Sequence, residues 1–282
     1  MSKEELLKEL ILTTLAEDIG QGDITTSAII DNNKPAQAKI IVKEDGVLAG
    51  LEIVKLTSSL LNDDIQFESH YKDGDRLKIN DTVIQIEGAI SSILKGERTA
   101  LNFLAHLSGI ATLTAKYVEK VHGTRAKIAD TRKTTPLIRE LEKEAVCLGG
   151  GVNHRMGLYD MILIKENHIE VAGSIQNAVN RCKQYLVDNN LNMRIEVETT
   201  NLSQVDEAIS CEVDQIMLDN MNLKAMKEAV ELISGRSVVE ASGGVSLETI
   251  QSIAETGVDL ISVGALTHSA PAMDFSLLLE GI

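Results

Sequence analysis

Residues 194–220 read RIEVETTNLSQVDEAISCEVDQIMLDN, and they decide the fold class because they contain a strand, a helix and a second strand in succession. The runs RIEVET and QIMLDN are short and rich in aliphatic residues, and each ends on polar residues, as buried strands do. The segment 202–209 between them carries apolar residues at helical spacing. This order predicts a right-handed βαβ unit of a parallel sheet.

The same alternation extends outward over the rest of the C-terminal half. Four further runs of this kind are RAKIAD (125–130), MILIKE (161–166), SVVEASGG (237–244) and LISVGA (260–265). Amphipathic segments separate the runs, for example at 174–187, 223–233 and 247–255. Six strands joined in this way predict an α/β fold with a barrel or barrel-like sheet covered by helices. A doubly wound open sheet fits the same alternation and stays an alternative.

In a parallel barrel the active site lies at the carboxyl ends of the strands, where the βα loops gather. The predicted strand ends carry Lys165, Glu198, Asp219, Ser242 and Gly264. These positions are therefore the first place to look for chemistry.

The N-terminal part follows a different pattern. Residues 36–43 alternate as a strand, and turn signals occur at Asp45-Gly46, Asp73-Gly74 and Asn80-Asp81. We expect a separate α+β domain with antiparallel hairpins. A helical segment at 95–121 joins the two parts; Gly109 is either a break or a point of close packing, and Arg98 on spacing alone is a solvated charge.

Charge is distributed unevenly along the chain. The 282 residues carry a formal net charge of −15, yet the window 125–168 holds eight Lys and Arg against six Asp and Glu. A cationic island in an acidic chain indicates a pocket for a small polyanion. Nucleic acid is excluded as a partner, because the overall negative charge would repel a phosphate backbone.

Composition narrows the class of protein further. Aromatic residues make up 2% of the chain and Trp is absent, so the core must be aliphatic. The three widely spaced cysteines indicate neither a disulfide framework nor a zinc site: Cys147, Cys182 and Cys211. The N-terminal segment has the pattern of an amphipathic helix rather than of a signal peptide, and no apolar run approaches the ~20 residues of a membrane span. We expect a cytoplasmic protein without a membrane partner.

Five cationic or titratable side chains are candidates for a binding site: Arg132, Lys133, His154, Arg155 and Lys165. Arginine suits planar carboxylates because its guanidinium donates two parallel hydrogen bonds, whereas lysine acts as a point charge on phosphate. Any one of them alone would be interpreted as a solvated charge. The Arg132-Lys133 pair, however, comes just after a predicted strand, and Lys165 lies in the apolar run MILIKE, where an unpaired ammonium is costly to bury.

Two acids, Glu198 and Asp219, end neighbouring predicted strands. Carboxylates at this place can bind ribose hydroxyls directly or Mg²⁺ through its waters. They could equally cap the following helices or pair with the cations. Residues 196 and 198 share a face of their strand, so the pattern does not choose between Glu196 and Glu198.

Glycine-rich turns occur at residues 149–151, at Ser242-Gly243-Gly244 and at Gly264. The last two follow predicted strands, an arrangement that presents main-chain N–H groups to a phosphate. Glycine loops, carboxylates and arginines together fit a phosphorylated sugar and a small di-acid. The sequence contains no evident Ser-His-Asp or activated Cys arrangement and no GxGxxG or GxxxxGK[ST] loop.

Longer blocks of the chain resemble one family. They are EDIGQGDITT, GERTALNFLAHLSGIAT, DTRKTTPLIRELEKEAVCLGGGVNHRMGLYDMILIKENHI, IEVET, LDN, EASGG and GVDLISVGALTHS. In this order, and over nearly the whole chain, they resemble quinolinate phosphoribosyltransferase, also called nicotinate-nucleotide diphosphorylase (carboxylating).

The resemblance implies an N-terminal open-faced α+β sandwich (1–110) and an incomplete α/β barrel (111–266). A C-terminal segment (267–282) returns to the N-terminal domain. It also implies a homodimer or a larger assembly of dimers, in which Arg98 is donated to the site of the neighbouring subunit.

By matching blocks, the resemblance assigns catalytic roles to Lys133, Glu198 and Asp219, with Glu198 rather than Glu196 as the functional acid. It places Glu198 and Asp219 near the ribose and a Mg²⁺ ion. It assigns the substrate pocket to Arg98, Thr131, Arg132, Lys133, His154, Arg155 and Lys165. The loops around the 5-phosphate are then Ser242, Gly243, Gly244, Val263, Gly264 and Ala265, with His268 beside the site.

The reaction implied is transfer of phosphoribose from phosphoribosyl pyrophosphate to quinolinate, giving nicotinate mononucleotide, pyrophosphate and CO₂. Mg²⁺ is the implied cofactor. One alternative is a related phosphoribosyltransferase that accepts a mono-acid such as nicotinate, for which fewer cations would be needed. A non-catalytic phosphate-binding barrel is the other, although it would have no use for carboxylates beside its ligand.

Overall fold

The computed structural model describes residues 3–30 and 34–280, and the chain forms two units. One is Thr114–Ser269, and the other combines Met1–Leu113 with Ala270–Ile282. The sequence placed the ends of the first two domains at 110 and 266, whereas these units change at 113 and 269. Each unit has a sheet of its own.

The unit of residues 114–269 contains a six-stranded parallel sheet in the order β6-β11-β10-β9-β8-β7. The strands are β6 (Lys127–Ala129), β7 (Ile162–Ile164), β8 (Ile195–Thr199), β9 (Gln215–Asp219), β10 (Val238–Ser242) and β11 (Leu260–Ser262). In the described part of the chain β6 and β7 do not pair with each other, so the ring of strands stays open. The prediction of an α/β fold with an incomplete barrel is confirmed.

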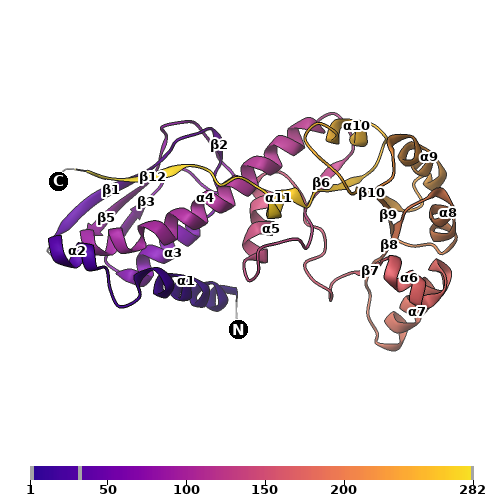
Figure 1. Ribbon diagram of the computed structural model, residues 1–282, viewed down its shortest axis with the longest axis horizontal. Helices are drawn as coiled ribbons and strands as arrows, with labels where there is room; N and C mark the ends of the chain where they lie inside the picture. The colour runs from indigo at the N-terminus through magenta and orange to yellow at the C-terminus, as the bar shows by residue number, and fades with distance from the viewer. Residues whose placement is uncertain (1–2, 31–33, 281–282) are drawn as a thin grey trace. The chain divides into compact units, whose positions relative to one another are not determined.

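Helices follow the strands of this barrel unit, and α8 and α9 cover one face of the sheet (Figure 1). The helices are α5 (Arg139–Leu148), α6 (Glu166–Ala172), α7 (Ile175–Asp188), α8 (Leu202–Ser210), α9 (Leu223–Ile233), α10 (Ile250–Ala254) and α11 (Ala265–His268). Three of them begin at side-chain caps: Ser174, Asn201 and Asn222 each accept a hydrogen bond from a main-chain N–H of the first turn. Of these three helices, α8 and α9 begin where strand-to-helix loops end, whereas α7 begins just after α6.

The other unit is built on an antiparallel sheet in the order β12-β1-β5-β3. Its strands are β1 (Pro35–Val42), β3 (Gln66–Glu68), β5 (Thr82–Ala89) and β12 (Phe275–Glu280), with a separate pair of β2 (Gly46–Val47) and β4 (Arg76–Leu77). The C-terminal strand β12 thus pairs with the first strand β1, from Gln37 opposite Glu280 to Val42 opposite Phe275. Strand β12 therefore completes the sheet of this sandwich unit.

Helices α1 (Lys3–Ile19), α2 (Ile24–Ile29) and α3 (Leu51–Leu61) also belong to the sandwich unit. Its core is aliphatic: Ile40, Val42 and Ile84 of the sheet pack with Val54 of α3 and Leu104 of α4 (Ile90–Lys120), and all are nearly free of solvent contact. The predicted aliphatic core is confirmed.

Helix α4 runs through Gly109 without a break. A side chain at this position would place its Cβ atom 2.1 Å from the carbonyl oxygen of Pro271, so the glycine allows the C-terminal segment to lie against the helix. Of the two interpretations of Gly109, close packing is correct. No helix in residues 3–30 and 34–280 is both long enough and apolar enough to cross a membrane.

Candidate active site

A cavity of about 810 Å³ opens at the carboxyl ends of the barrel strands. Most residues that the sequence singled out lie in its wall: Thr131, Arg132, Lys133, His154, Arg155, Lys165, Glu198, Asp219, Ser242, Gly243, Gly244, Gly264, Ala265 and His268. They come from loops up to 137 positions apart in the chain, from 131 to 268. Parallel pairing brings them together because it places every strand's carboxyl end on the same side of the sheet.

Two predicted residues lie elsewhere. The side chain of Val263 is almost completely buried, with 1% of the residue exposed, and it does not line the cavity. Arg98 lies on α4 in the sandwich unit, where its side chain is 64% exposed and its guanidinium is 2.6 Å from the carboxylate of Glu97. Within its own chain, as far as the structure describes it, Arg98 is a surface residue.

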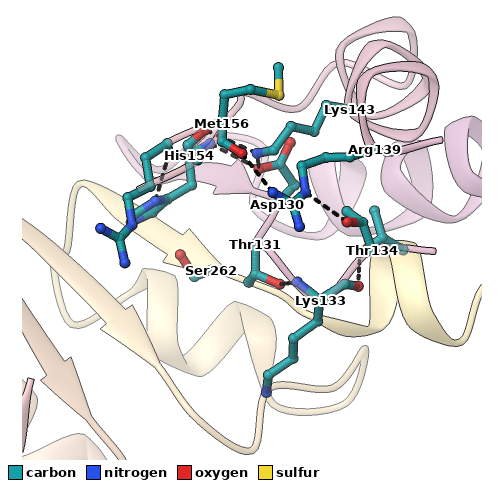
Figure 2. A network of polar contacts seen from close by, with 12 residues as sticks. Asp130, Thr131, Lys133, Thr134, Arg139, Lys143, His154, Met156 and Ser262 are labelled. Atoms are coloured by element: carbon teal, nitrogen blue, oxygen red, sulfur yellow. Dashed lines mark hydrogen bonds and ion pairs between the residues drawn. The ribbon is translucent and has the colours of Figure 1, made fainter. Parts of the chain in front are cut away.

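The loop after β6 presents Arg132 and Lys133, both exposed. The main-chain N–H of Lys133 donates to Thr131 Oγ1 (3.1 Å), and the Lys133 carbonyl accepts from Thr267 Oγ1 (2.8 Å). Figure 2 shows the Lys133 side chain extending away from these main-chain contacts. The backbone of the loop is therefore tethered while its ammonium group is left for a ligand.

Arg155 is half-buried in the opposite loop, where its Nη1 donates to the carbonyl of Met161 (3.1 Å). Burial, and then the positive charge of Arg132, lower the pKa of Arg155 from its usual value. Two guanidinium groups that repel each other in one cavity wall are the expected arrangement for a site that awaits an anion.

The environment of Lys165 differs from the one expected. Strand β7 ends at Ile164, so Lys165 follows the apolar run instead of lying inside it, and its side chain is 48% exposed. Its Nζ donates to Glu198 Oε2 (2.9 Å). The ammonium thus has both solvent and a carboxylate partner, and the supposed cost of burying it does not arise.

Asp219 ends β9, and its Oδ2 accepts a hydrogen bond from the side-chain amide of Asn220 (2.8 Å). Asn220 has a left-handed backbone (φ 53°), and it faces Gly243 so closely that a Cβ there would lie 2.2 Å from Asn220 Oδ1. Gly243 has φ 92°, which favours glycine. The glycine after β10 therefore makes room for the amide that orients Asp219.

Sequence reasoning did not identify Asn220 or five other lining residues: Leu163, Met217, Glu240, Val245 and Ser262. Four of these residues lie in predicted strands: Leu163, Met217, Glu240 and Ser262. Strand periodicity shows which side chains share a face, but it does not tell which face lines the cavity. The glycine triplet at 149–151 has a different role from the other glycine turns. A Cβ at Gly151 would lie 2.8 Å from Val146 and 2.9 Å from Thr114, so this turn serves close packing.

His154 is the residue whose surroundings differ most from expectation. Its ring is buried against two acids inside the barrel, with Nε2 3.1 Å from Glu196 and 3.4 Å from Glu240. Burial by itself would lower the pKa of His154, but the hydrogen bonds to the two carboxylates and their negative charge raise it to about 9. His154 therefore lines the cavity while its Nε2 faces two acids, one of which, Glu240, is also a lining residue.

Gln215 and Ser262 complete this buried cluster. The amide of Gln215 donates to Glu196 (2.8 Å) and to Glu240 (2.5 Å), and the Ser262 hydroxyl donates to Glu240. Burial raises the pKa of Glu196, opposed by its hydrogen bond with His154. Both oxygens of Glu240 and Oε1 of Glu196 thus accept hydrogen bonds, whereas Oε2 of Glu196 faces His154 Nε2 at 3.1 Å.

The three ionisable members, His154, Glu196 and Glu240, also lie close enough together to be considered as metal ligands. The second ring nitrogen argues against that use, because Nδ1 of His154 accepts the main-chain N–H of Arg155 (2.7 Å). A ring that ligates a metal through Nε2 keeps a proton on Nδ1 and donates it. We therefore interpret the cluster as a hydrogen-bond network.

The fold and the cavity together define a class: an α/β barrel with an anion-binding site at the carboxyl ends of its strands. Two family models cover most of the chain. Residues 110–278 match the C-terminal domain of quinolinate phosphoribosyl transferase and residues 23–108 match its N-terminal domain. The chain belongs to the quinolinate phosphoribosyl transferase family, which confirms the resemblance drawn from the sequence.

Individual proteins agree with the family models. The chain is 41% identical to quinolinate phosphoribosyltransferase (decarboxylating) 1b of Nicotiana tabacum over 97% of its own length and 82% of that protein. It is 42% identical to a probable nicotinate-nucleotide pyrophosphorylase (carboxylating) of Bacillus subtilis, over 96% and 92%. The crystal structure of NadC from Streptococcus pyogenes, 42% identical, superposes with a TM-score of 0.94 over 100% of this chain and 99% of that one.

Proposed function

We propose that this chain transfers the phosphoribosyl group of phosphoribosyl pyrophosphate to the ring nitrogen of quinolinate, with loss of CO₂. The products are nicotinate mononucleotide, pyrophosphate and CO₂, in NAD biosynthesis. The observation that carries the proposal is one cavity wall that combines four cations with two acids: Arg132, Lys133, Arg155, Lys165, Glu198 and Asp219. The cations suit a di-acid and a diphosphate, and the acids suit a sugar.

The cations divide between the two substrates. Arg132, Arg155 and Lys165 bind the two carboxylates of quinolinate, for which the planar guanidinium groups are well matched. Lys133 acts on the diphosphate as a point charge and neutralises the negative charge that develops as it leaves. His154 lies in the same wall, where its Nδ1 accepts the main-chain N–H of Arg155 and its Nε2 lies 3.1 Å from Glu196.

Glu198 and Asp219 bind the ribose and hold its C1 carbon against the pyridine nitrogen. Departure of pyrophosphate leaves positive charge on the sugar ring, and two carboxylates at this place stabilise that charge. The Lys165 contact on Glu198 and the Asn220 contact on Asp219 fix the direction of each acid. Catalysis in this proposal is mainly positioning and electrostatic stabilisation.

We also propose Mg²⁺ as the cofactor, bound through water by Glu198 and Asp219. The donor set fits a hard cation, since both groups are carboxylates at the cavity wall. Each has one oxygen bound by a neighbouring side chain, Glu198 Oε2 by Lys165 and Asp219 Oδ2 by Asn220. When bound, the ion would supply positive charge to the diphosphate.

Decarboxylation follows glycosylation. Once its nitrogen carries the ribose, the pyridinium ring accepts the electron pair of the breaking bond between C2 and the carboxylate carbon. CO₂ leaves, and C2 takes up a proton. The substrate ring itself is the electron acceptor in this step.

The direct test supplies phosphoribosyl pyrophosphate, Mg²⁺ and either quinolinate or nicotinate, and measures mononucleotide and CO₂. We expect one CO₂ for each mononucleotide with quinolinate and no product with nicotinate. Turnover of nicotinate would favour the mono-acid alternative, for which a crystal structure of human nicotinic acid phosphoribosyltransferase offers a likeness of fold alone (11% identity, TM-score 0.60). Ligand binding without turnover of either acid would favour a sensor.

We propose a homodimer, or a larger assembly of such dimers, in which Arg98 enters the neighbouring subunit's site. The exposure of its guanidinium supports this role, because the charge is available at the surface. Mixed dimers of Arg98→Ala and Lys165→Ala subunits should recover part of the activity that each variant lacks. If purified mixed dimers stay inactive, the shared site is refuted.

A cytoplasmic location stays a prediction. Among the relatives, one from Nicotiana tabacum is described as mitochondrial and one from Arabidopsis thaliana as chloroplastic. Cell fractionation with an antibody against the chain would decide the location.

A further inference from the structure

Helix α5 presents three charged side chains on one face, at positions spaced by three and four residues: Arg139, Glu142 and Lys143. Glu142 and Lys143 are fully buried, and Lys143 is among the largest side chains in the core. A buried charge is costly unless it is paired and hydrogen-bonded. The groups that these three side chains contact therefore indicate the role of this helix face.

Lys143 makes two contacts through one ammonium group. Its Nζ forms an ion pair with Asp130 Oδ1, and it also donates to the main-chain carbonyl of His154 (3.0 Å). The same oxygen of Asp130 accepts the main-chain N–H of His154 (2.9 Å). One buried ion pair thus binds both the N–H and the C=O of a single residue in the cavity wall (Figure 2).

Asp130 has a second oxygen with a partner in the same loop. The amide nitrogen of Asn153 lies 2.6 Å from Asp130 Oδ2 and 2.9 Å from the carbonyl of Lys143, in the orientation that satisfies both acceptors. Asp130 directly follows β6 and directly precedes Thr131. Its carboxylate therefore joins the start of one cavity loop to the middle of another.

Arg139 and Glu142 connect the same two loops further along. Arg139 Nε donates to Thr134 Oγ1 (2.9 Å), and its Nη1 donates to the carbonyl of Met156 (3.1 Å). Glu142 accepts the main-chain N–H of Thr135 (3.0 Å). One helix face is thereby attached to the segments 130–135 and 153–156 at several points.

These two segments carry three of the four cations in the cavity wall, Arg132, Lys133 and Arg155, together with His154. Neither segment is helix or strand, so no regular hydrogen-bond ladder determines its path. Several of the contacts that set the path begin on α5. Moving either segment would move guanidinium and ammonium groups relative to each other, and displacement by about 1 Å is enough to cost about a hundredfold in rate.

We propose that Lys143, Asp130 and Arg139 are positioning residues: through the backbone of segments 130–135 and 153–156, they set the spacing of the cations that receive the di-acid. The inference rests on the proposed function for the identity of the ligand and extends it to residues outside the cavity wall. None of the three lines the cavity, and their effect on catalysis is indirect.

The decisive variant replaces the whole buried pair by neutral side chains of similar size, Asp130→Asn with Lys143→Met. Neutral replacement of both partners relieves the buried charge, so we expect the melting temperature to return close to that of the wild type after its fall in Lys143→Met alone. Activity should not return with it. We expect kcat/KM for quinolinate to stay at least about thirtyfold below the wild type, mostly through a higher KM, because the donor from residue 143 to the His154 carbonyl is not restored.

If both the melting temperature and kcat/KM of the double variant recover, the latter to within about threefold of the wild type, the pair has only a structural role. If the double variant does not fold, Arg139 decides the question. We expect Arg139→Met to lower kcat/KM for quinolinate by about tenfold at little cost in melting temperature, and Arg139→Lys to recover part of the loss. A value for Arg139→Met within about twofold of the wild type refutes the proposal.

Arg236→Met is the matched control. Arg236 also donates to main-chain carbonyls, those of Ile233 (3.0 Å) and Leu232, but it does not line the cavity. We expect this variant to retain wild-type kcat/KM. The wild-type protein tests the proposed function by itself, because absence of turnover with quinolinate would contradict it. The kcat/KM values of the variants relative to the wild type test the positioning role.

Discussion

The sandwich unit and the barrel unit differ in what they bury. Among the described residues of the sandwich unit, no Asp, Glu, Lys or Arg is buried, and the core is made of aliphatic side chains with Met273 and Phe275. The barrel unit contains five fully buried charged residues, Asp130, Glu142, Lys143, Glu196 and Glu240. Since the interior charges cost free energy, their concentration behind one cavity indicates that they organise the site.

The largest effect is expected from breaking the buried pair. Lys143→Met leaves Asp130 without its cation in a position with no solvent contact, and we expect a loss of about 3–5 kcal/mol in the free energy of unfolding. Denaturant unfolding monitored by circular dichroism measures it. A loss below about 1 kcal/mol would mean that the pair is not buried as described.

A substitution in the cavity wall should lower activity by a free-energy equivalent of similar size, and it should hardly change the free energy of unfolding. Arg132 is exposed, so Arg132→Ala removes no packing, but it removes a fork-shaped donor for a carboxylate. We expect kcat/KM for quinolinate to fall by at least about a hundredfold, or roughly 3 kcal/mol. Steady-state kinetics gives the number, and a decrease of less than about threefold would remove Arg132 from the site.

The buried cluster around His154 predicts a dependence of stability on pH. The folded-state pKa of His154 is about 9, above its ordinary value of 6.5, so its contribution is complete below pH 6.5 and is lost as the pH rises through 9. The raised pKa of Glu196 acts in the same direction. We expect the free energy of unfolding to fall by up to about 3 kcal/mol between pH 6.5 and 9.5.

Thermal unfolding across this pH range provides the measurement, and Glu196→Gln provides the control. The variant should show a flatter profile because one of the two acids that hold the proton is neutral. Equal slopes in both proteins would show that the pH dependence arises elsewhere.

The smallest effect belongs to the apolar core. Ile40→Val in the sandwich unit removes one methylene from a residue with no solvent contact, and we expect a loss of about 0.5–1.5 kcal/mol. The loss should be the same at pH 6.5 and 9.5, and kcat/KM should be unchanged. A pH-dependent difference, measured by the same unfolding assay, would weaken the contrast between the two units.

Much of the cavity wall could be predicted because it lies at strand ends. Lys165, Glu198 and Asp219 each follow or end an aliphatic run, and parallel strands bring such positions together without further information. Glu196 and Glu198 show where this reasoning stops. They share a face of β8, as expected, but one is buried in the hydrogen-bond network and the other pairs with Lys165 at the rim. Depth along the barrel axis, which periodicity does not encode, separates them.

By itself the sequence determined the local properties of this protein: alternation of strands and helices, the aliphatic core, and a cationic island in an acidic chain. Those follow from periodicity and composition, which act over a few neighbouring residues. The tertiary structure alone decided the partners of the charges, such as Lys143 with Asp130 and His154 with Glu196 and Glu240. These pairs join residues 13 to 86 positions apart, so only the packing of distant segments determines whether a charge lies in solvent, in a cavity or in the core.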